Sequence, residues 1–138
     1  MLFHAENKIS IKELSTLSLA FVGDGVLELL VRQRAVSTTR LPPNKLHQLS
    51  VKFVSAKGQF VGLNAIKGLL TEKESDIVRR GKNANKATVS KHATTEEYRA
   101  STGFEALFGY LYLENENERI LELFELYWNA IVAENEMI

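Results

Sequence analysis

The amino-acid sequence predicts an all-α fold, and three observations support this prediction. The chain of 138 residues has only two prolines, adjacent at Pro42 and Pro43. The usual signals of strands, Asn-Gly hairpins and sustained alternation of apolar and polar residues, do not occur in it. Apolar residues recur instead at the three- and four-residue spacing of helices. With 45% apolar and 25% charged residues, the chain has the composition of one globular domain, which we expect to span residues 1–138.

The first half of the chain is expected to form a long helix followed by shorter ones. Ser10 and Glu13 have the spacing of a capping box, which predicts a helix from about Ile11 to Val36. Its apolar face would carry Leu14, Leu17, Phe21 and Val22. After a linker, Pro43 is a favourable first residue for a second helix. Three later glycines weaken helix propensity, so the stretch to Leu70 could form two shorter helices: Gly58, Gly62 and Gly68.

The second half contains two further capping boxes. Thr71 with Glu74 begins a short helix that we expect to end at Gly81, because glycine accepts the left-handed conformation after a helix. Residues 82–93 are polar, contain no acid and are predicted to form an exposed loop. The second box, Thr94 with Glu97, begins a helix that runs to about Glu114. The last helix is predicted over residues 118–134.

Charge is distributed unevenly along the chain although the formal net charge is zero. Residues 29–95 hold thirteen lysines and arginines against three acids, whereas residues 114–138 hold seven glutamates and one arginine. A basic middle joined to an acidic end suggests a polyanion as partner. The alternative is that the charges are separated by helix face and average out in space.

Two acidic residues stand where stability alone would not place them. Asp24 lies between two glycines in the apolar stretch AFVGDGVL, and Glu105 lies in the apolar stretch GFEALF. If the two helices pack side by side, the carboxylates repel each other unless a cation lies between them, and oxygen ligands suit magnesium or manganese. The alternative is that each acid lies on a polar face or pairs with Arg32 or Arg99. We expect Glu28 to pair with Arg32, four residues along the same helix.

The basic middle contains a segment suited to a nucleic-acid backbone. The sequence RRGKNANK combines guanidinium, ammonium and amide groups with a glycine, and these groups fit phosphate oxygens and sugar hydroxyls. It lacks aromatic residues, so a duplex backbone is a better ligand than stacked single-stranded bases. The candidate RNA-binding residues are Arg79, Arg80, Lys82, Asn83, Lys86 and Lys91.

Several classes of function find no support in the sequence. The chain has no cysteine, which excludes disulfides, thiolate zinc sites and a cysteine nucleophile. The three histidines lack metal-ligand spacing, and neither a P-loop nor a dinucleotide-binding glycine pattern is present. No signal peptide or membrane span is recognisable, so we expect a soluble cytoplasmic protein without a membrane partner.

Two segments together resemble the catalytic segments of the ribonuclease III endonuclease domain: FVGDGVLELLV and TGFEALFGYLYL. The segments PPNKLH, FVSAK, RRGKN and EYRASTGFEALFGYLYL extend this resemblance to the Mini-III branch over nearly the whole chain. That branch lacks a separate double-stranded-RNA-binding domain. The resemblance implies an all-α homodimer that hydrolyses double-stranded RNA with Mg²⁺, for which Mn²⁺ could substitute, and leaves 5′-phosphate and 3′-hydroxyl ends.

The resemblance also implies roles for particular residues. Asp24 and Glu105 match the aspartate and glutamate of the family's two catalytic segments and would both be catalytic metal ligands. Larger members carry two further acids, but the matching positions here are Ala20 and Thr102, which leaves the number of metal ions open. The Mini-III branch further implies maturation of the large-subunit (23S) ribosomal RNA precursor, with a ribosomal protein as a possible auxiliary.

Two other functions compete with this interpretation. The first is a catalytically inactive RNA-binding or ribosome-associated module with the same fold, against which the retention of both Asp24 and Glu105 argues. The second is a helical interaction protein without a role in nucleic-acid binding, which the zero net charge would suit.

Overall fold

The computed structural model describes residues 8–84 and 94–135, and every regular element in these ranges is helical. The elements are η1 (Ile11–Glu13), α1 (Thr16–Thr38), α2 (Pro43–Val54), α3 (Ala56–Ile66), η2 (Lys67–Leu69), α4 (Glu72–Ala84), α5 (Thr95–Leu113) and α6 (Asn117–Glu134), where η denotes a 3-10 helix. The all-α prediction is therefore confirmed for the described part of the chain. Within it, no helix is long and apolar enough to span a bilayer.

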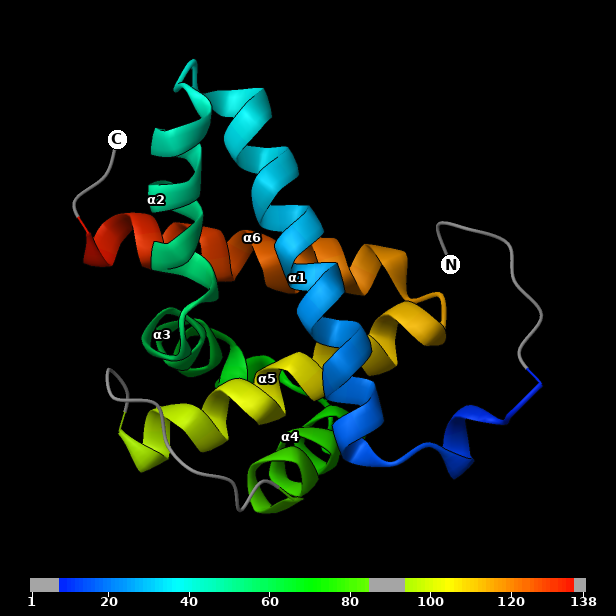
Figure 1. Ribbon diagram of the computed structural model, residues 1–138. Helices are drawn as coiled ribbons and strands as arrows, with labels where there is room; N and C mark the ends of the chain where they lie inside the picture. Colours follow the sequence, from blue (N-terminus) through cyan, green and yellow to red (C-terminus); the bar gives the residue numbers. More distant parts are fainter. Residues whose placement is uncertain (1–7, 85–93, 136–138) are drawn as a thin grey trace.

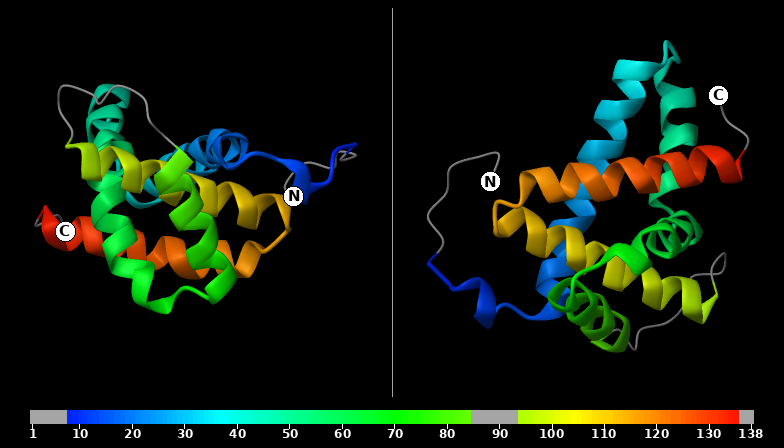
Figure 2. Two further views of the ribbon diagram at one scale, coloured as in Figure 1. Left: turned by 90° about the horizontal axis from the view of Figure 1, so that it is seen from below. Right: turned by 180° about the vertical axis from the view of Figure 1, so that it is seen from behind.

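Helix α5 lies at the centre of the molecule, with α1, α3, α4 and α6 packed against it (Figures 1 and 2). Ten of its nineteen residues are buried, which explains why its sequence is apolar on almost every face. The main core joins α5 to α2 and α6 through a cluster of aromatic rings: Phe53, Phe104, Phe108, Phe124 and Tyr127. The hydroxyl of Tyr127 donates a hydrogen bond of 2.5 Å to the carbonyl of Phe53, so this buried polar group is satisfied.

The first helix begins later than the sequence predicts. Ser10 caps only the short helix η1, and α1 begins at Thr16, where the Ser15 hydroxyl accepts a hydrogen bond from the Ser18 amide. The predicted single helix from Ile11 was wrong because Leu14 is extended and separates two competing serine caps. Helix α1 then continues to Thr38, two residues beyond the predicted end.

The predicted helix starts between α2 and α5, and the division of the stretch to Leu70 into shorter helices, are confirmed. Pro43 is the first residue of α2, and Ser55 divides the following stretch into α2 and α3 by capping the amide of Gly58. Thr71 and Glu74 form the predicted reciprocal hydrogen bonds before α4. Thr94 and Glu97 form the same reciprocal pair at the start of α5. These local signals therefore define where the helices that carry the candidate site begin.

Helix α4 does not end at Gly81, as predicted, but continues to Ala84. Gly81 is buried, and a Cβ atom on it would lie 2.7 Å from the Cα of Gly103. The glycine therefore permits a close contact between α4 and α5 instead of ending the helix. Lys82 and Asn83, predicted in the loop, belong to α4, whereas the remainder of that loop lies outside the described residues.

Candidate active site

The site is formed where α1 crosses α5 at two glycines. A Cβ atom on Gly23 would lie 1.6 Å from the backbone oxygen of Glu105, and one on Gly109 would lie 1.9 Å from the backbone oxygen of Leu19. Real Cβ atoms essentially never approach to less than 3.0 Å, so only glycine fits at either position. This contact brings Asp24, the residue after Gly23, next to Glu105.

The other glycine beside Asp24 has a different environment. A Cβ atom on Gly25 would meet no atom within 4 Å, so this position faces open space on the described surface of the chain. Of the two glycines beside Asp24, Gly23 is therefore the one that permits the close approach of another helix. For Gly25 the chain itself supplies no neighbour.

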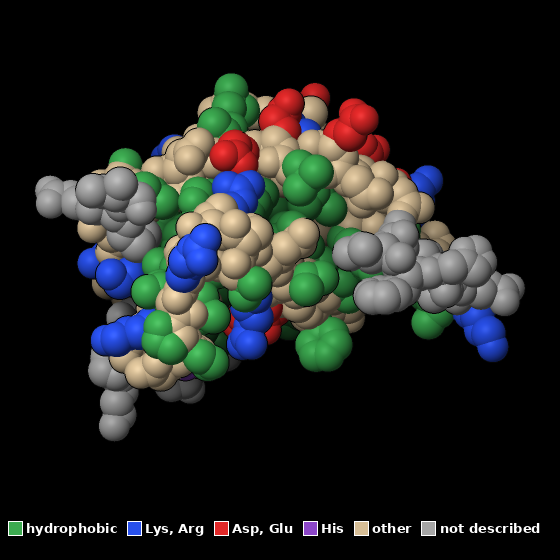
Figure 3. Space-filling model, turned by 90° about the horizontal axis from the view of Figure 1, so that it is seen from above, with side chains coloured by type: hydrophobic (Ala, Val, Ile, Leu, Met, Phe, Trp, Pro, Cys, Tyr) green, Lys and Arg blue, Asp and Glu red, His purple; other side chains and the backbone are tan. Residues whose placement is uncertain are grey.

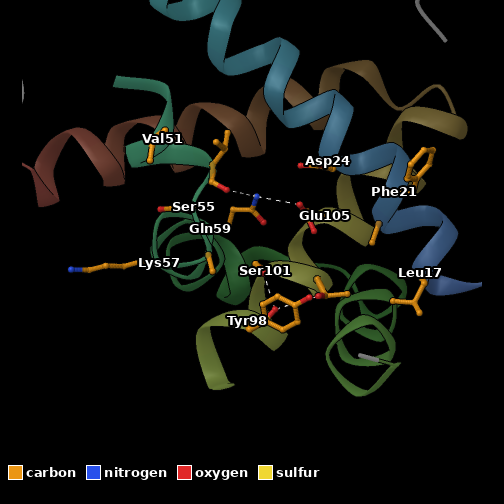
Figure 4. A pocket seen from close by; sticks show the side chains of 14 residues that line it. Leu17, Phe21, Asp24, Val51, Ser55, Lys57, Gln59, Tyr98, Ser101 and Glu105 are labelled. Carbon is orange, nitrogen blue, oxygen red and sulfur yellow. Dashed lines mark hydrogen bonds between the residues drawn. The ribbon is translucent and has the colours of Figure 1, made fainter. Parts of the chain in front are cut away.

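Asp24 and Glu105 line the same pocket, which has a volume of about 800 Å³ (Figure 4). Asp24 is exposed on the α1 wall, whereas Glu105 is half-buried on α5. The remaining lining comes from α1, the α2–α3 corner and the start of α5: Leu17, Ala20, Phe21, Val51, Val54, Ser55, Ala56, Lys57, Gln59, Tyr98, Ser101 and Thr102. The pocket lining therefore combines two carboxyl groups with apolar side chains and uncharged polar side chains.

The two carboxyl groups interact directly. Burial, followed by the negative charge and hydrogen bonding of Asp24, raises the pKa of Glu105 to about 8, while a hydrogen bond from Gln59 acts in the opposite direction. Glu105 thus retains a proton at neutral pH because a negative charge is unfavourable both in this buried position and beside Asp24. A cation between the two groups would remove that cost.

The donor set fits a hard divalent cation. Two carboxylates supply oxygen ligands, and Mg²⁺ is commonly held by one or two carboxylates while keeping several waters or substrate phosphate oxygens. Within the described residues, no three or more histidine, cysteine, aspartate or glutamate side chains lie together so that they could hold a metal ion. The pair Asp24 and Glu105 would therefore have to hold the ion without a third acidic ligand.

The alternative pairings considered from the sequence are not present. Among the described residues, no ion pair joins Asp24 or Glu105 to Arg32 or Arg99. Arg32 instead pairs with Glu28 at 3.2 Å, as predicted. The prediction that Asp24 and Glu105 meet is therefore supported by the geometry.

Ala20 and Thr102, the two positions without an acid, line the same pocket as Asp24 and Glu105. Ala20 lies one turn before Asp24 on α1, and Thr102 lies almost one turn before Glu105 on α5, where its hydroxyl donates to the Tyr98 carbonyl at 3.3 Å. A carboxylate at either position would face the same cavity. Asp24 and Glu105 are thus the only acidic residues among the described residues that line the pocket.

Sequence reasoning missed two other residues of the pocket. Gln59 is 1% exposed, and its Nε2 donates to the Val54 carbonyl at 3.1 Å and to Glu105 Oε2 at 3.4 Å (Figure 4). A signal was available, because Gln59 shares the buried face of α3 with Leu63 and Ile66. Lys57 is exposed at the pocket rim, and its isolated position in α3 gave no such signal.

The predicted RNA-binding residues that the structure describes do not line this pocket. Arg79 and Arg80 are exposed on α4 and both pair with Asp76, while Lys82 and Asn83 follow in the last turn. Arg79, Lys82 and Asn83 line a separate cleft of about 300 Å³ between α3 and α4. The other two candidates, Lys86 and Lys91, lie outside the described residues.

Charge is also separated in space to some degree. In Figure 3 most of the visible acidic side chains gather along one edge, while most of the basic ones lie elsewhere on the same face. Two of the glutamates in α6 are engaged with arginines, Glu122 with Arg119 and Glu125 with Arg34. The acidic end of the sequence therefore has a structural role as well as a charge.

Comparison with known proteins identifies the family. The model of the ribonuclease III domain matches residues 17–116, which include α1 with Asp24 and α5 with Glu105. The chain belongs to the ribonuclease III family. A protein named Mini-ribonuclease 3 from a Thermoanaerobacter species is 46% identical over 119 residues, covering 86% of this chain and 84% of that protein. The Mini-ribonuclease 3 of Enterococcus faecalis is 42% identical, covering 81% of this chain and 86% of the relative.

A solved structure supports the same family fold. The crystal structure of a protein from Fusobacterium nucleatum matches with a TM-score of 0.78 and 32% sequence identity, covering 84% of this chain and 94% of that one. The resemblance to the Mini-III branch, proposed from the sequence, is therefore confirmed. The matches cover most of the length of these relatives.

Proposed function

We propose that this protein is an endoribonuclease that hydrolyses phosphodiester bonds in double-stranded RNA with the help of Mg²⁺, or Mn²⁺ in its place. One observation carries the proposal: α1 and α5 cross at Gly23 and bring Asp24 and Glu105 together in an open pocket. The names of the relatives, Mini-ribonuclease 3, support the same reaction class. The products would carry 5′-phosphate and 3′-hydroxyl ends.

Asp24 and Glu105 would hold the cation, which when bound supplies activation of a water molecule and charge stabilisation at the leaving 3′ oxygen. The side chains themselves have defined tasks. Asp24 is exposed and can reach a ligand from the solvent side, whereas Glu105 is held from behind by Gln59. Glu105 must release its proton to act as a ligand, so loading of the site should release protons at neutral pH.

The basic end of α4 would bind the RNA backbone. Lys82 lies against Gly103, two residues before Glu105, so α4 approaches the helix that carries the site. We assign backbone contact to Arg79, Arg80, Lys82 and Asn83, together with Lys86 and Lys91. Contacts of this kind make affinity fall steeply with salt. Replacing both Arg80 and Lys82 by alanine should weaken duplex cleavage and reduce its salt dependence, and unchanged values would exclude this surface.

Lys57 is a further candidate for phosphate contact. It is the only lysine or arginine among the described residues that line the pocket of Asp24 and Glu105. Lys57 is exposed, and its side chain points away from the two carboxyl groups in Figure 4, so it would have to turn toward them to contact a phosphate bound there. A Lys57→Ala variant should therefore weaken binding of the duplex more at low salt than at high salt.

A homodimer would place two such sites across one duplex so that each cuts one strand. Helix α1 offers an exposed apolar surface for a second copy: Leu17 is 48% exposed, Phe21 83% and Leu29 49%. Gly25 lies between Phe21 and Leu29, four residues from each, and a Cβ there would meet no atom of its own chain. Two copies of α1 could therefore approach closely at Gly25, with Phe21 of each covered by its partner.

The cellular role follows the family. We assign the protein to maturation of the 23S ribosomal RNA precursor in the cytoplasm, with a ribosomal protein as a candidate auxiliary factor. The first experiment is cleavage of labelled duplex RNA, the matching single strand and the matching DNA duplex, with Mg²⁺ or chelator, by the wild type and by Asp24→Asn. We expect cutting of duplex RNA alone, dependent on Mg²⁺ and lost in the variant.

The same experiment separates the competing functions. If the wild type binds duplex RNA but cuts it with neither Mg²⁺ nor Mn²⁺, the protein is an inactive RNA-binding module. If it does not bind RNA at moderate salt, a helical interaction protein without a nucleic-acid role is the remaining function. Cutting that persists in Asp24→Asn would remove the assigned role of Asp24.

A further inference from the structure

Gln59 is an uncharged polar residue of the pocket whose burial the fold does not explain. It is 1% exposed in a helix whose other large buried side chains, Leu63 and Ile66, are apolar. A long amide loses side-chain entropy and hydration when it is buried, and it repays this cost only when its polar atoms are paired. A methionine or leucine would occupy the same space without that requirement.

Only half of the amide is paired. Nε2 donates to the Val54 carbonyl at 3.1 Å and to Glu105 Oε2 at 3.4 Å. Oε1 is buried and has no hydrogen-bond donor among the described residues. It is the only buried side-chain nitrogen or oxygen in the described part of the chain that lacks a partner, and it belongs to a residue that lines the pocket of Asp24 and Glu105.

The paired half fixes the amide in one orientation. The Val54 carbonyl is a backbone acceptor at the end of α2, so it requires a donor and selects Nε2 for that side of the amide. If the amide were turned over, an oxygen would face both this carbonyl and the Glu105 carboxyl. Oε1 is therefore held as an acceptor for which the described chain supplies no donor, on a residue that lines the pocket, and a small ligand in the pocket would satisfy it.

We propose that Gln59 is a positioning residue of the site, holding Glu105 Oε2 through its Nε2 and accepting, through Oε1, a hydrogen bond from a water molecule beside that carboxylate. This inference rests on the proposed function. One amide would then fix both a carboxylate ligand and a water near it, anchored to the α2–α3 corner through Val54. Groups of this kind, which orient a metal ligand without touching the metal, typically change metal affinity or activity 10- to 100-fold when removed.

The test uses Gln59→Met, which keeps length and removes both polar atoms, and Gln48→Met as a control at an exposed position of α2. Mn²⁺ binding to the RNA-free protein is measured by electron paramagnetic resonance, and duplex affinity is measured in chelator. We expect Gln59→Met to bind Mn²⁺ about 10- to 100-fold more weakly and to lose kcat by a similar factor, with unchanged duplex affinity in chelator. Gln48→Met should match the wild type in all three.

The outcomes distinguish this inference from the proposed function. If the wild type neither binds Mn²⁺ at Asp24 and Glu105 nor cuts duplex RNA, the proposed function fails and Gln59 has no site to position. If the wild type does both and Asp24→Asn loses both, but Gln59→Met binds Mn²⁺ and turns over like the control, the inference alone is overturned. If Gln59→Met does not fold, Gln59→Asn provides the same comparison, because its shorter amide cannot reach both Val54 and Glu105.

Discussion

Replacing Gly23 by alanine tests whether the α1–α5 crossing creates the site. The new Cβ would lie 1.6 Å from the Glu105 carbonyl oxygen, so the two helices would have to separate by about 1.4 Å to reach the closest distance that real Cβ atoms show. The contacting atom is backbone and cannot rotate away. Overpacking of this kind costs about 1–3 kcal/mol or more, against a gain of about 1 kcal/mol from replacing glycine inside a helix.

We expect the cost of separating the helices to exceed the gain in helix propensity, because the new Cβ overlaps with backbone atoms. The overlap extends to Gly109, whose backbone nitrogen lies 2.9 Å from the same Cβ position. A net loss of about 2 kcal/mol would lower the Tm of a chain of 138 residues by about 7 °C. Duplex cleavage should fall further than stability alone explains, because Asp24 would move away from Glu105.

The matched control is Gly68→Ala, since a Cβ on Gly68 would meet no atom within 4 Å. Both variants are measured by thermal melting followed by circular dichroism and by duplex cleavage at a temperature where both are folded. Gly68→Ala should leave Tm and cleavage close to those of the wild type. A Gly23→Ala protein that melts no lower than Gly68→Ala and cuts as fast would refute the close crossing as the basis of the site.

Three further predictions concern charge and assembly. In chelator, the stability that the proton on Glu105 confers is fully present below about pH 4.5 and is lost as pH rises through the folded-state pKa of about 8. The Tm of Glu105→Gln should therefore rise relative to the Tm of the wild type over this range. A constant difference in Tm would contradict the raised pKa. Glu74→Ala should lower the free energy of unfolding in urea by about 2–3 kcal/mol, because Glu74 is 5% exposed and paired with Arg119. Glu122→Ala should lower it by only about 0.5 kcal/mol, because the Glu122 side chain is 62% exposed. Equal losses in the two variants would be inconsistent with this reasoning. Phe21→Asp should keep the Tm of the isolated fold but yield monomers in sedimentation velocity if Phe21 is covered by a second copy, and an unchanged sedimentation coefficient would exclude that interface.

The helices were predictable wherever a local cap decides where they begin. Thr71, Thr94 and Pro43 act within one turn of chain, and the structure confirms all three. The helix boundaries were predicted wrongly where a serine or a glycine could take either of two structural roles. Ser10 and Ser15 are both good caps, and only packing determines that α1 begins after the second. Gly81 suits a helix end, but its burial against Gly103 gives it a different role.

The two acids of the site were predictable because each interrupts an apolar segment, and such an interruption is unfavourable unless a partner is present. Gln59 interrupts its segment in the same way but is uncharged, so its cost is smaller and it was missed. The family resemblance supplied the reaction and the substrate, which no spacing of residues could have supplied. The distance between α1 and α5 could not be predicted, because it depends on the pairing of Gly23 with Gly109 across 86 positions of sequence.

The contrast between two acids of this chain explains why the site points to a cation. Glu74 is almost fully buried, yet Arg119 and the Thr71 amide pair with both of its oxygens and its pKa is lowered. For Glu105, burial raises the pKa, and the neighbouring carboxyl group of Asp24 acts in the same direction. The fold therefore supplies hydrogen-bond and charge partners for Glu74, which serves stability. It leaves the set of partners around Glu105 incomplete.

The incomplete features lie together. The glycine crossing lowers helix propensity, the two carboxyl groups repel, and the Gln59 oxygen lacks a donor, all around one pocket. Two of these costs, the repulsion between the carboxylates and the unpaired amide oxygen, would be reduced by one event, the binding of a hydrated divalent cation, which neutralises the carboxylates and brings water that can donate to the amide. Bound metal should therefore stabilise the wild type more than Glu105→Gln, and equal stabilisation of both proteins would mean that these costs have separate origins.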